Sequence, residues 1–161
     1  MKKNYIDLLY VTLLGIIILL STSIYEKSLE LLLYTIGFSF IFPIFWYIMT
    51  YFTADLSGWM RLSKTYTTTK DPPPMAFYTS GKIGPITYSN ILKLGAYSEG
   101  LWLSVMPGFR INSPVMIIPW SDIQVRPYKS MWFFSMVELM VNGVRIKLLK
   151  SKWHRVYALS E

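Results

Sequence analysis

The chain has 161 residues and a net charge of +7, with 53% hydrophobic and 17% aromatic residues. This length allows about one ordinary domain, and the apolar content is high for a soluble protein, which predicts a membrane-embedded part. The sequence has no cysteine, so disulfides, thiolate chemistry and cysteine-based metal sites are excluded.

The first predicted element is an uncharged apolar run from Leu8 to Ile24. Its length is at the short end for a transmembrane helix. A secretory signal peptide is the alternative, because Lys2 and Lys3 precede the run and small residues lie near its end. The run exceeds a typical signal-peptide core and a second apolar run follows closely, so a transmembrane helix is favoured.

A second uncharged run, Leu31 to Ala54, is long enough to cross a hydrocarbon core of about 30 Å. Pro43 lies in its middle, where it removes one backbone hydrogen bond and favours a kink. Aromatic residues gather at the exit end, and amphipathic aromatics prefer the headgroup region. The predicted interface anchors are Trp46, Tyr51 and Trp59.

The link between the two runs, residues 25–30, is short, so the two helices are expected to form an antiparallel hairpin. Lysines precede the hairpin and basic residues follow it, whereas the link holds one lysine and two glutamates. The positive-inside rule therefore predicts a multi-pass protein of the cell (inner) membrane, with both termini in the cytoplasm.

Two segments follow the hairpin. In residues 58–66, GWMRLSKTY, helical spacing of Trp59 and Leu62 predicts either a short interfacial helix or a continuation of the second span. Residues 67–74, TTTKDPPP, favour an extended, semi-rigid linker, because the prolines exclude helix. The soluble domain is accordingly expected at residues 75–161.

The pattern of the domain is that of short strands and turns. Residues 86–88 and 91–94 are short candidates, and residues 101–105 alternate with a period of two. The apolar run 115–120 suits a strand buried on both faces or an edge strand ending at Pro119. The sequence also predicts a turn at Ser98-Glu99-Gly100.

The clearest hairpin signal is Asn142-Gly143, because both residues accept positive φ. Apolar residues alternate on both sides of it, in residues 137–141 and 144–148. Antiparallel strands joined by such short turns predict a small antiparallel β-barrel or sandwich.

Several segments resemble the middle of a pleckstrin-homology-like (PH-like) or GRAM-like β-domain. They are GLWLSV at 100–105, Phe109-Arg110, and VMIIPWSDIQV at 115–125. Uncharacterised bacterial proteins with two spans and such a domain look similar over the whole chain, including residues 58–66. The resemblance implies a PH-like fold and no particular activity. It departs at the C-terminus, where either residues 152–159 form a stub of the usual long capping helix or something else covers the barrel.

No catalytic constellation is visible. His154 is a lone histidine, the acidic residues after position 54 form no metal or hydrolytic motif, and Gly81 and Gly84 are not part of a complete phosphate loop. The two apolar runs hold no ionisable group, which argues against transport by this chain alone. The sequence predicts a protein that is not an enzyme, with no metal and no cofactor.

The distribution of basic residues gives the most specific indication of function. The 13 basic residues after position 54 outnumber the six acidic ones, so the whole excess lies there. Five of them form a basic strip that would dock on anionic lipid or an acidic partner, or would simply be a solvated edge that discourages aggregation. The strip is Arg145, Lys147, Lys150, Lys152 and Arg155. Nucleic acid is not an expected partner.

Two functions fit these features. The first is a non-enzymatic, membrane-anchored binding or scaffold protein, whose cytoplasmic β-domain contacts a protein partner or anionic lipid headgroups. The alternative is an accessory subunit of a larger membrane complex, held among other membrane protein subunits by its two helices. A basic patch or groove on the domain favours the first, and a dry aromatic stripe on the helices favours the second.

Topology is directly testable. Cysteines introduced by Ser28→Cys and Ser130→Cys should differ toward an impermeant thiol reagent in intact cells. The link should be labelled and the domain protected, because the lysine and arginine asymmetry places the domain inside. Labelling at position 130 but not at position 28 would show the opposite orientation.

Overall fold

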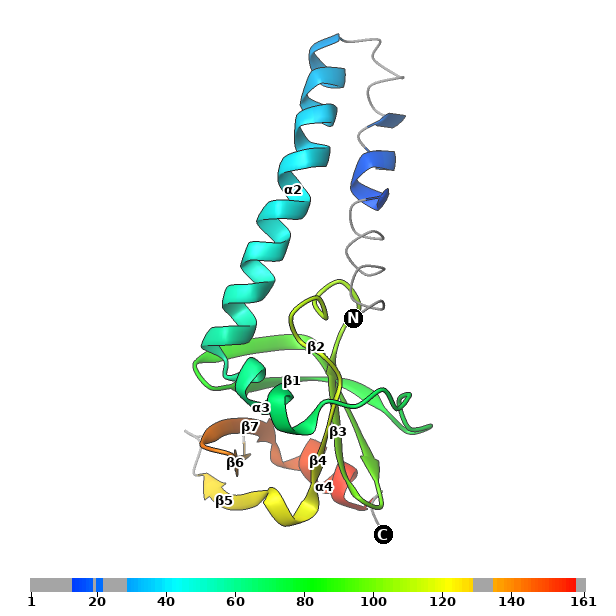
Figure 1. The fold of residues 1–161 in the computed structure, drawn as a ribbon. Helices are drawn as coiled ribbons and strands as arrows, with labels where there is room; N and C mark the ends of the chain where they lie inside the picture. The colour runs from blue at the N-terminus through cyan, green and yellow to red at the C-terminus, as the bar shows by residue number, and fades with distance from the viewer. Residues whose placement is uncertain (1–12, 19, 22–28, 129–134, 159–161) are drawn as a thin grey trace.

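A computed structural model describes residues 13–18, 20–21, 29–128 and 135–158 (Figure 1). A long helix, α2 (Leu29–Leu56), projects from a curled antiparallel sheet of seven strands. The short helices α3 (Trp59–Tyr66) and α4 (Lys150–Ala158) pack against this sheet. In the described residues the architecture is thus a long apolar helix and a small half-barrel with short helices on it.

α2 is apolar along nearly its whole length. Residues 33–56 have a mean hydropathy of 1.5, and only 11% of the most apolar window is buried, so this helix is long and apolar enough to cross a membrane. It begins and ends close to the expected bounds of 31 and 54, and Pro43 lies inside it. The predicted second span is therefore confirmed as a helix of spanning length.

The predicted first span lies mostly outside the described residues. Its described parts, residues 13–18 and 20–21, are helical. A Cβ added at Gly15 would lie 3.4 Å from Phe38 Cε1, so this segment packs beside α2. That this segment also spans a membrane stays a prediction.

The chain turns sharply after α2. Gly58 adopts a left-handed conformation with φ of 81°, and α3 begins at the next residue, so α3 is a separate helix and not a continuation of α2. Trp59 and Leu62 are fully buried in the domain core. The sheet, not lipid, therefore covers the apolar face of α3, and a position of this helix at the bilayer surface stays a prediction.

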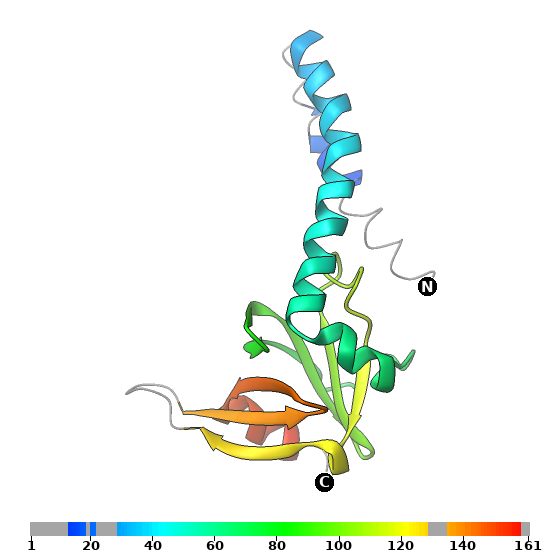
Figure 2. The ribbon, with the colours of Figure 1, turned by 60° about the vertical axis from the view of Figure 1, so that its left-hand side comes forward.

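The sheet is antiparallel throughout, with the strand order β4-β3-β2-β1-β7-β6-β5. Its strands are β1 (Phe77–Ile83), β2 (Ile86–Tyr97), β3 (Gly100–Val105), β4 (Met116–Pro119), β5 (Gln124–Tyr128), β6 (Met136–Val141) and β7 (Val144–Leu149). A short 3-10 turn, η1 (Trp120–Asp122), joins β4 to β5. The sheet curls into a half-barrel (Figure 2). This confirms the antiparallel β-domain, while its PH-like identity stays a prediction.

Individual strand predictions had mixed outcomes. β4 is an edge strand that ends at Pro119, which is one of the two alternatives for that apolar run. The turn before Gly100 is confirmed by the pairing of Tyr97 with Gly100. The two short candidates at 86–88 and 91–94 are instead one continuous strand, β2, because Asn90 passes through positive φ (57°) without ending it.

α4 covers part of the half-barrel. It begins directly after β7 and buries Trp153 and Val156, with contacts to β2, β6 and β7. The ring of Trp153 packs at 6.1 Å from that of Trp120. Of the two alternatives for the C-terminus, the short capping helix is the correct one.

The proline-rich segment is not a free spacer. Thr68 N donates to Val115 O at 2.9 Å, and Trp102 Nε1 donates to Lys70 O at 3.2 Å. Lys70 also forms an ion pair of 2.6 Å with Glu99. Residues 67–74 are therefore held against the sheet, and the packed domain includes α3, so its N-terminal limit differs from the expected residue 75.

The turn between β6 and β7 gives a stability prediction. Asn142 and Gly143 have φ of 44° and 75°, as the hairpin signal predicts. Gly143→Val should reduce the free energy of unfolding by about 1 kcal/mol or more, because a β-branched residue strains at positive φ. Thermal or denaturant unfolding of the full chain measures this. Gly143→Asn is the matched control and should cost less, and equal costs would contradict the explanation.

Candidate functional site

The most specific contacts outside the sheet join α2 to the loop between β3 and β4. Trp46 Nε1 donates a hydrogen bond of 2.7 Å to Gly108 O, and the Trp46 ring meets Phe109 edge-on at 5.1 Å. Trp46 lies ten residues before the end of α2, about 15 Å along its axis. The loop therefore reaches back along the helix.

Two further side chains hold this loop on the helix. Asn112 Nδ2 donates to Tyr47 O at 3.3 Å and to Thr50 Oγ1 at 3.2 Å. Below them, Trp59 Nε1 donates to Pro114 O at 3.0 Å. The half-barrel is consequently attached to α2 at several points and not only through the chain between them.

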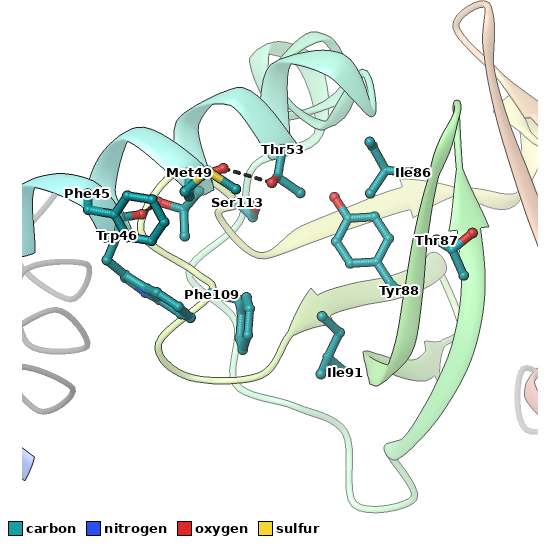
Figure 3. Close-up of a pocket in the computed structure, with 11 residues that line it drawn as sticks. Phe45, Trp46, Met49, Thr53, Ile86, Thr87, Tyr88, Ile91, Phe109 and Ser113 are labelled. Atoms are coloured by element: carbon teal, nitrogen blue, oxygen red, sulfur yellow. Dashed lines mark hydrogen bonds between the residues drawn. The ribbon is translucent and has the colours of Figure 1, made fainter. Parts of the chain in front are cut away.

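A cavity of about 320 Å³ lies between α2 and β2 beside this loop (Figure 3). Most of its lining is apolar or aromatic. The lining residues are Phe45, Trp46, Met49, Thr50, Thr53, Ile86, Thr87, Tyr88, Ile91, Phe109 and Ser113. Its volume is within the range of small-molecule pockets, roughly 300–1,000 Å³.

Tyr88 is the unusual member of this lining. The residue is 3% exposed, and among the described residues its buried hydroxyl makes no hydrogen bond of normal geometry, although the Ser57 hydroxyl lies beside it. Burial raises the pKa of its phenol, and the Ser57 hydroxyl opposes part of that rise. Ser57 is already engaged, because it donates to Ala54 O at 3.1 Å and accepts from Trp59 N at 3.2 Å.

A second, shallower pocket lies where α2 ends. It is lined by residues from the end of α2, the start of α3, and the β1–β2 and β6–β7 turns. Two of these are Arg61 and Arg145, which share the pocket with Asp55. Within the described parts of the chain, neither guanidinium has a hydrogen bond or an ion pair. The pocket therefore presents two unpaired cations beside the end of the apolar helix.

The predicted basic strip does not form one surface. Lys147 lies opposite Glu138 on β6 and pairs with it at 3.4 Å. Lys152 and Arg155 lie over the ring of Phe77, at 5.8 Å and 4.4 Å from its centroid. Lys150 begins α4, which lies at the end of the molecule opposite to α2 (Figures 1 and 2). Only Arg145 lies near the end of α2, where it joins Arg61.

The three predicted interface anchors also lie in different environments. Tyr51 is 41% exposed on α2, whereas Trp46 is half-buried against the β3–β4 loop. Trp59 is fully buried. Its expected role as an anchor in the headgroup region is therefore corrected, because its indole completes the core of the domain.

The described residues offer little for catalysis. No group of three His, Asp or Glu residues among them is placed to hold a metal ion, and His154 is exposed on α4. The Tyr66 hydroxyl donates to Asp122 at 2.9 Å, and burial together with this carboxylate raises the pKa of Tyr66. Phenols with raised pKa, such as Tyr66 and Tyr88, are not activated as bases near neutral pH.

Comparisons with protein-family models, with curated proteins and with solved structures give no match. The resemblance to PH-like domains therefore stays a prediction. The candidate site is therefore defined by its geometry alone. Two of its parts were not predicted from the sequence. The loop 106–113 carries no periodicity, and Arg61 and Arg145 lie on separate elements that only folding brings together.

The attachment of the loop to α2 is testable. Trp46→Phe keeps an aromatic ring but removes the hydrogen bond to Gly108 O. We expect faster amide hydrogen exchange in residues 106–112, corresponding to a loss of about 1 kcal/mol in local opening free energy. Tyr47→Phe, which removes an exposed hydroxyl on the same turn, should leave exchange unchanged. Equal effects of both variants would show that the Trp46 bond does not hold the loop.

Proposed function

We propose that this protein is a non-enzymatic, membrane-anchored binding protein whose half-barrel binds anionic lipid headgroups at the end of α2. Arg61 and Arg145 are the contacting residues. The N-terminal helical segment and α2 anchor the chain in the cell membrane, and the half-barrel lies on its cytoplasmic side. This places the lipid site at the junction and not on the predicted strip.

The observation that carries this proposal is the position of the two unpaired arginines. Both line the pocket that is formed where α2 ends and α3 begins. If α2 crosses the bilayer, its end lies at the headgroup level, so the pocket faces phosphate groups. A guanidinium binds phosphate oxygens through two parallel N–H groups, which makes arginine well suited to this role.

The magnitude of the attraction is moderate. Each basic residue near an anionic surface contributes about 1 kcal/mol, and the effect fades within a Debye length of roughly 10 Å at 0.1 M salt. Asp55 shares the pocket, so two positive charges act against one negative charge there. The basic residues of α4 are further away, because that helix lies at the opposite end of the molecule.

The aromatic stripe on α2 also supports a binding module more than an accessory subunit. Phe38, Phe42 and Trp46 stack in succession, with centroids 4.8 Å and 5.7 Å apart. Contacts within the chain already cover both ends of the stripe, at Gly15 and at Phe109. The chain itself therefore covers part of this stripe, while Phe38 is still 41% exposed.

A charge-selective stabilisation experiment tests the proposal. The full-length protein in mixed micelles at low salt should gain thermal stability from phosphatidylglycerol and not from phosphatidylcholine, because binding to the folded state stabilises it. The double variant Arg61→Gln/Arg145→Gln should lose about 2 kcal/mol of this lipid-dependent stabilisation. Raising the salt concentration should reduce the wild-type effect.

The matched control is Lys150→Gln/Lys152→Gln, which removes the same charge at the distal end of the domain. It should keep the response to phosphatidylglycerol. If both double variants lose it equally, the junction site is wrong and only net charge matters. If the wild type responds equally to both lipids, headgroup binding is refuted and the accessory-subunit interpretation gains support.

A further inference from the structure

We propose that the pocket at the end of α2, which Arg61 and Arg145 line, selects a phosphoserine headgroup, and that Asp55 sets this selectivity. Such a headgroup carries a phosphate, a carboxylate and an ammonium group. The selectivity rests on the proposed binding of anionic headgroups at this pocket and adds the kind of headgroup to it. Its support comes from the one negative charge in the pocket.

Three charged side chains meet in this pocket. Arg61 and Arg145 are exposed cations, and Asp55 is an exposed anion. Within the described residues, the Asp55 carboxylate has no hydrogen bond or ion pair, and neither guanidinium has one. Opposite charges therefore share one pocket of about 410 Å³ without pairing with each other. Two positive groups and one negative group stay available for a ligand.

The two arginines reach the pocket from different elements. Arg61 extends from α3 toward the β6–β7 turn, since a Cβ added at Gly143 would lie 3.8 Å from Arg61 Nη1. Arg145 follows that turn on β7, and its backbone oxygen accepts a hydrogen bond of 2.8 Å from Gly84 N in the β1–β2 turn. The backbone around both cations is thus fixed by the fold.

Asp55 does not stabilise the helix that carries it. It is the second-last residue of α2, whose last turn holds no basic residue. A carboxylate there lies beside the negative end of the helix dipole, which is unfavourable. Within the described residues no ion pair compensates this charge. A ligand cation beside Asp55 would offset the unfavourable interaction.

A phosphoserine headgroup carries the opposite set of charges. Its phosphate and its carboxylate can each accept two parallel hydrogen bonds from one guanidinium. Its ammonium group can donate to the Asp55 carboxylate. Phosphoglycerol offers only the phosphate and leaves Asp55 unpaired. Phosphoethanolamine adds the ammonium group but lacks the carboxylate, so one guanidinium stays unpaired.

Apolar side chains beside the pocket favour a lipid over a soluble phosphoserine compound. Leu56 lines the pocket and is 59% exposed, and Phe52, one turn earlier on α2, is 55% exposed. A lipid carries hydrocarbon directly next to its charged headgroup, so it can cover these side chains while the headgroup occupies the pocket. A soluble headgroup compound leaves them exposed.

A comparison of two lipids with the same net charge tests the selectivity. The full-length protein in mixed micelles at low salt is titrated with phosphatidylserine or phosphatidylglycerol while its thermal stability is followed. Because the net charges match, non-specific attraction is the same for both. Half-maximal stabilisation should need about threefold to tenfold less phosphatidylserine, the effect expected for two further exposed ion pairs. Equal requirements would overturn the selectivity.

Asp55→Asn keeps the shape of the side chain and removes its charge. It should remove the preference by weakening the response to phosphatidylserine, and it should not weaken the response to phosphatidylglycerol. The matched control is Glu99→Gln, which removes an acidic charge outside the pocket and should keep the preference. An unchanged preference in Asp55→Asn, or an equal loss in both variants, would contradict the role of Asp55.

The outcomes separate the selectivity from headgroup binding itself. If both anionic lipids stabilise the protein equally and more than phosphatidylcholine, anionic binding stands and the selectivity is refuted. If neither exceeds phosphatidylcholine, the proposed function fails and the selectivity fails with it. Glycerophosphoserine, which has the headgroup without acyl chains, should stabilise less than phosphatidylserine at the same concentration. An equal effect of the two would refute a lipid as the ligand.

Discussion

The structure depends on how the chain leaves α2. Gly58 turns it through a positive φ while lying against Val144, where an added Cβ would come within 2.9 Å of Val144 Cγ2. This tight turn sends Trp59 and Leu62 directly into the core of the half-barrel. Since the first residues after the helix are core residues, the domain cannot swing freely on a tether. Its position relative to α2 is part of the fold.

This coupling explains why the candidate sites lie at the junction. The loop 106–113 lies along α2 because Trp46 and Asn112 hydrogen-bond across the gap. With the loop and β2 held beside the helix, a largely apolar cavity remains between them. The same turn brings Arg61 next to the β6–β7 hairpin that carries Arg145. The proposed headgroup contact therefore follows from this geometric constraint.

Local patterns predicted the local structure well. The long uncharged run became α2, the alternation around Asn142-Gly143 became a hairpin with both residues at positive φ, and the apolar run before Pro119 became an edge strand. In each case the deciding physics acts over a few neighbouring residues. Hydropathy, side-chain alternation and backbone sterics are all readable within such a window.

Surfaces and boundaries were predicted less well. The basic strip looked continuous in sequence, but its strand residues and its helix residues point to different surroundings, and Lys147 pairs with Glu138. The segment 67–74 looked like a spacer, yet hydrogen bonds from Thr68 and Trp102 fix it to the sheet. Trp59 looked like an interface anchor and is a core residue. Each of these outcomes depends on partners far away in the chain.

By itself the sequence determined that this protein combines a helix of membrane-spanning length with a small antiparallel β-domain carrying the net positive charge. Those properties follow from composition and short-range periodicity. Only the tertiary structure decided which charges are free, which aromatics are buried and where a cavity remains. Arg61 and Arg145 are 84 positions apart in numbering and meet in one pocket, because the turn at Gly58 and the curl of the sheet bring their elements together. No local pattern encodes such a meeting, since it results from the packing of the whole domain against the end of α2.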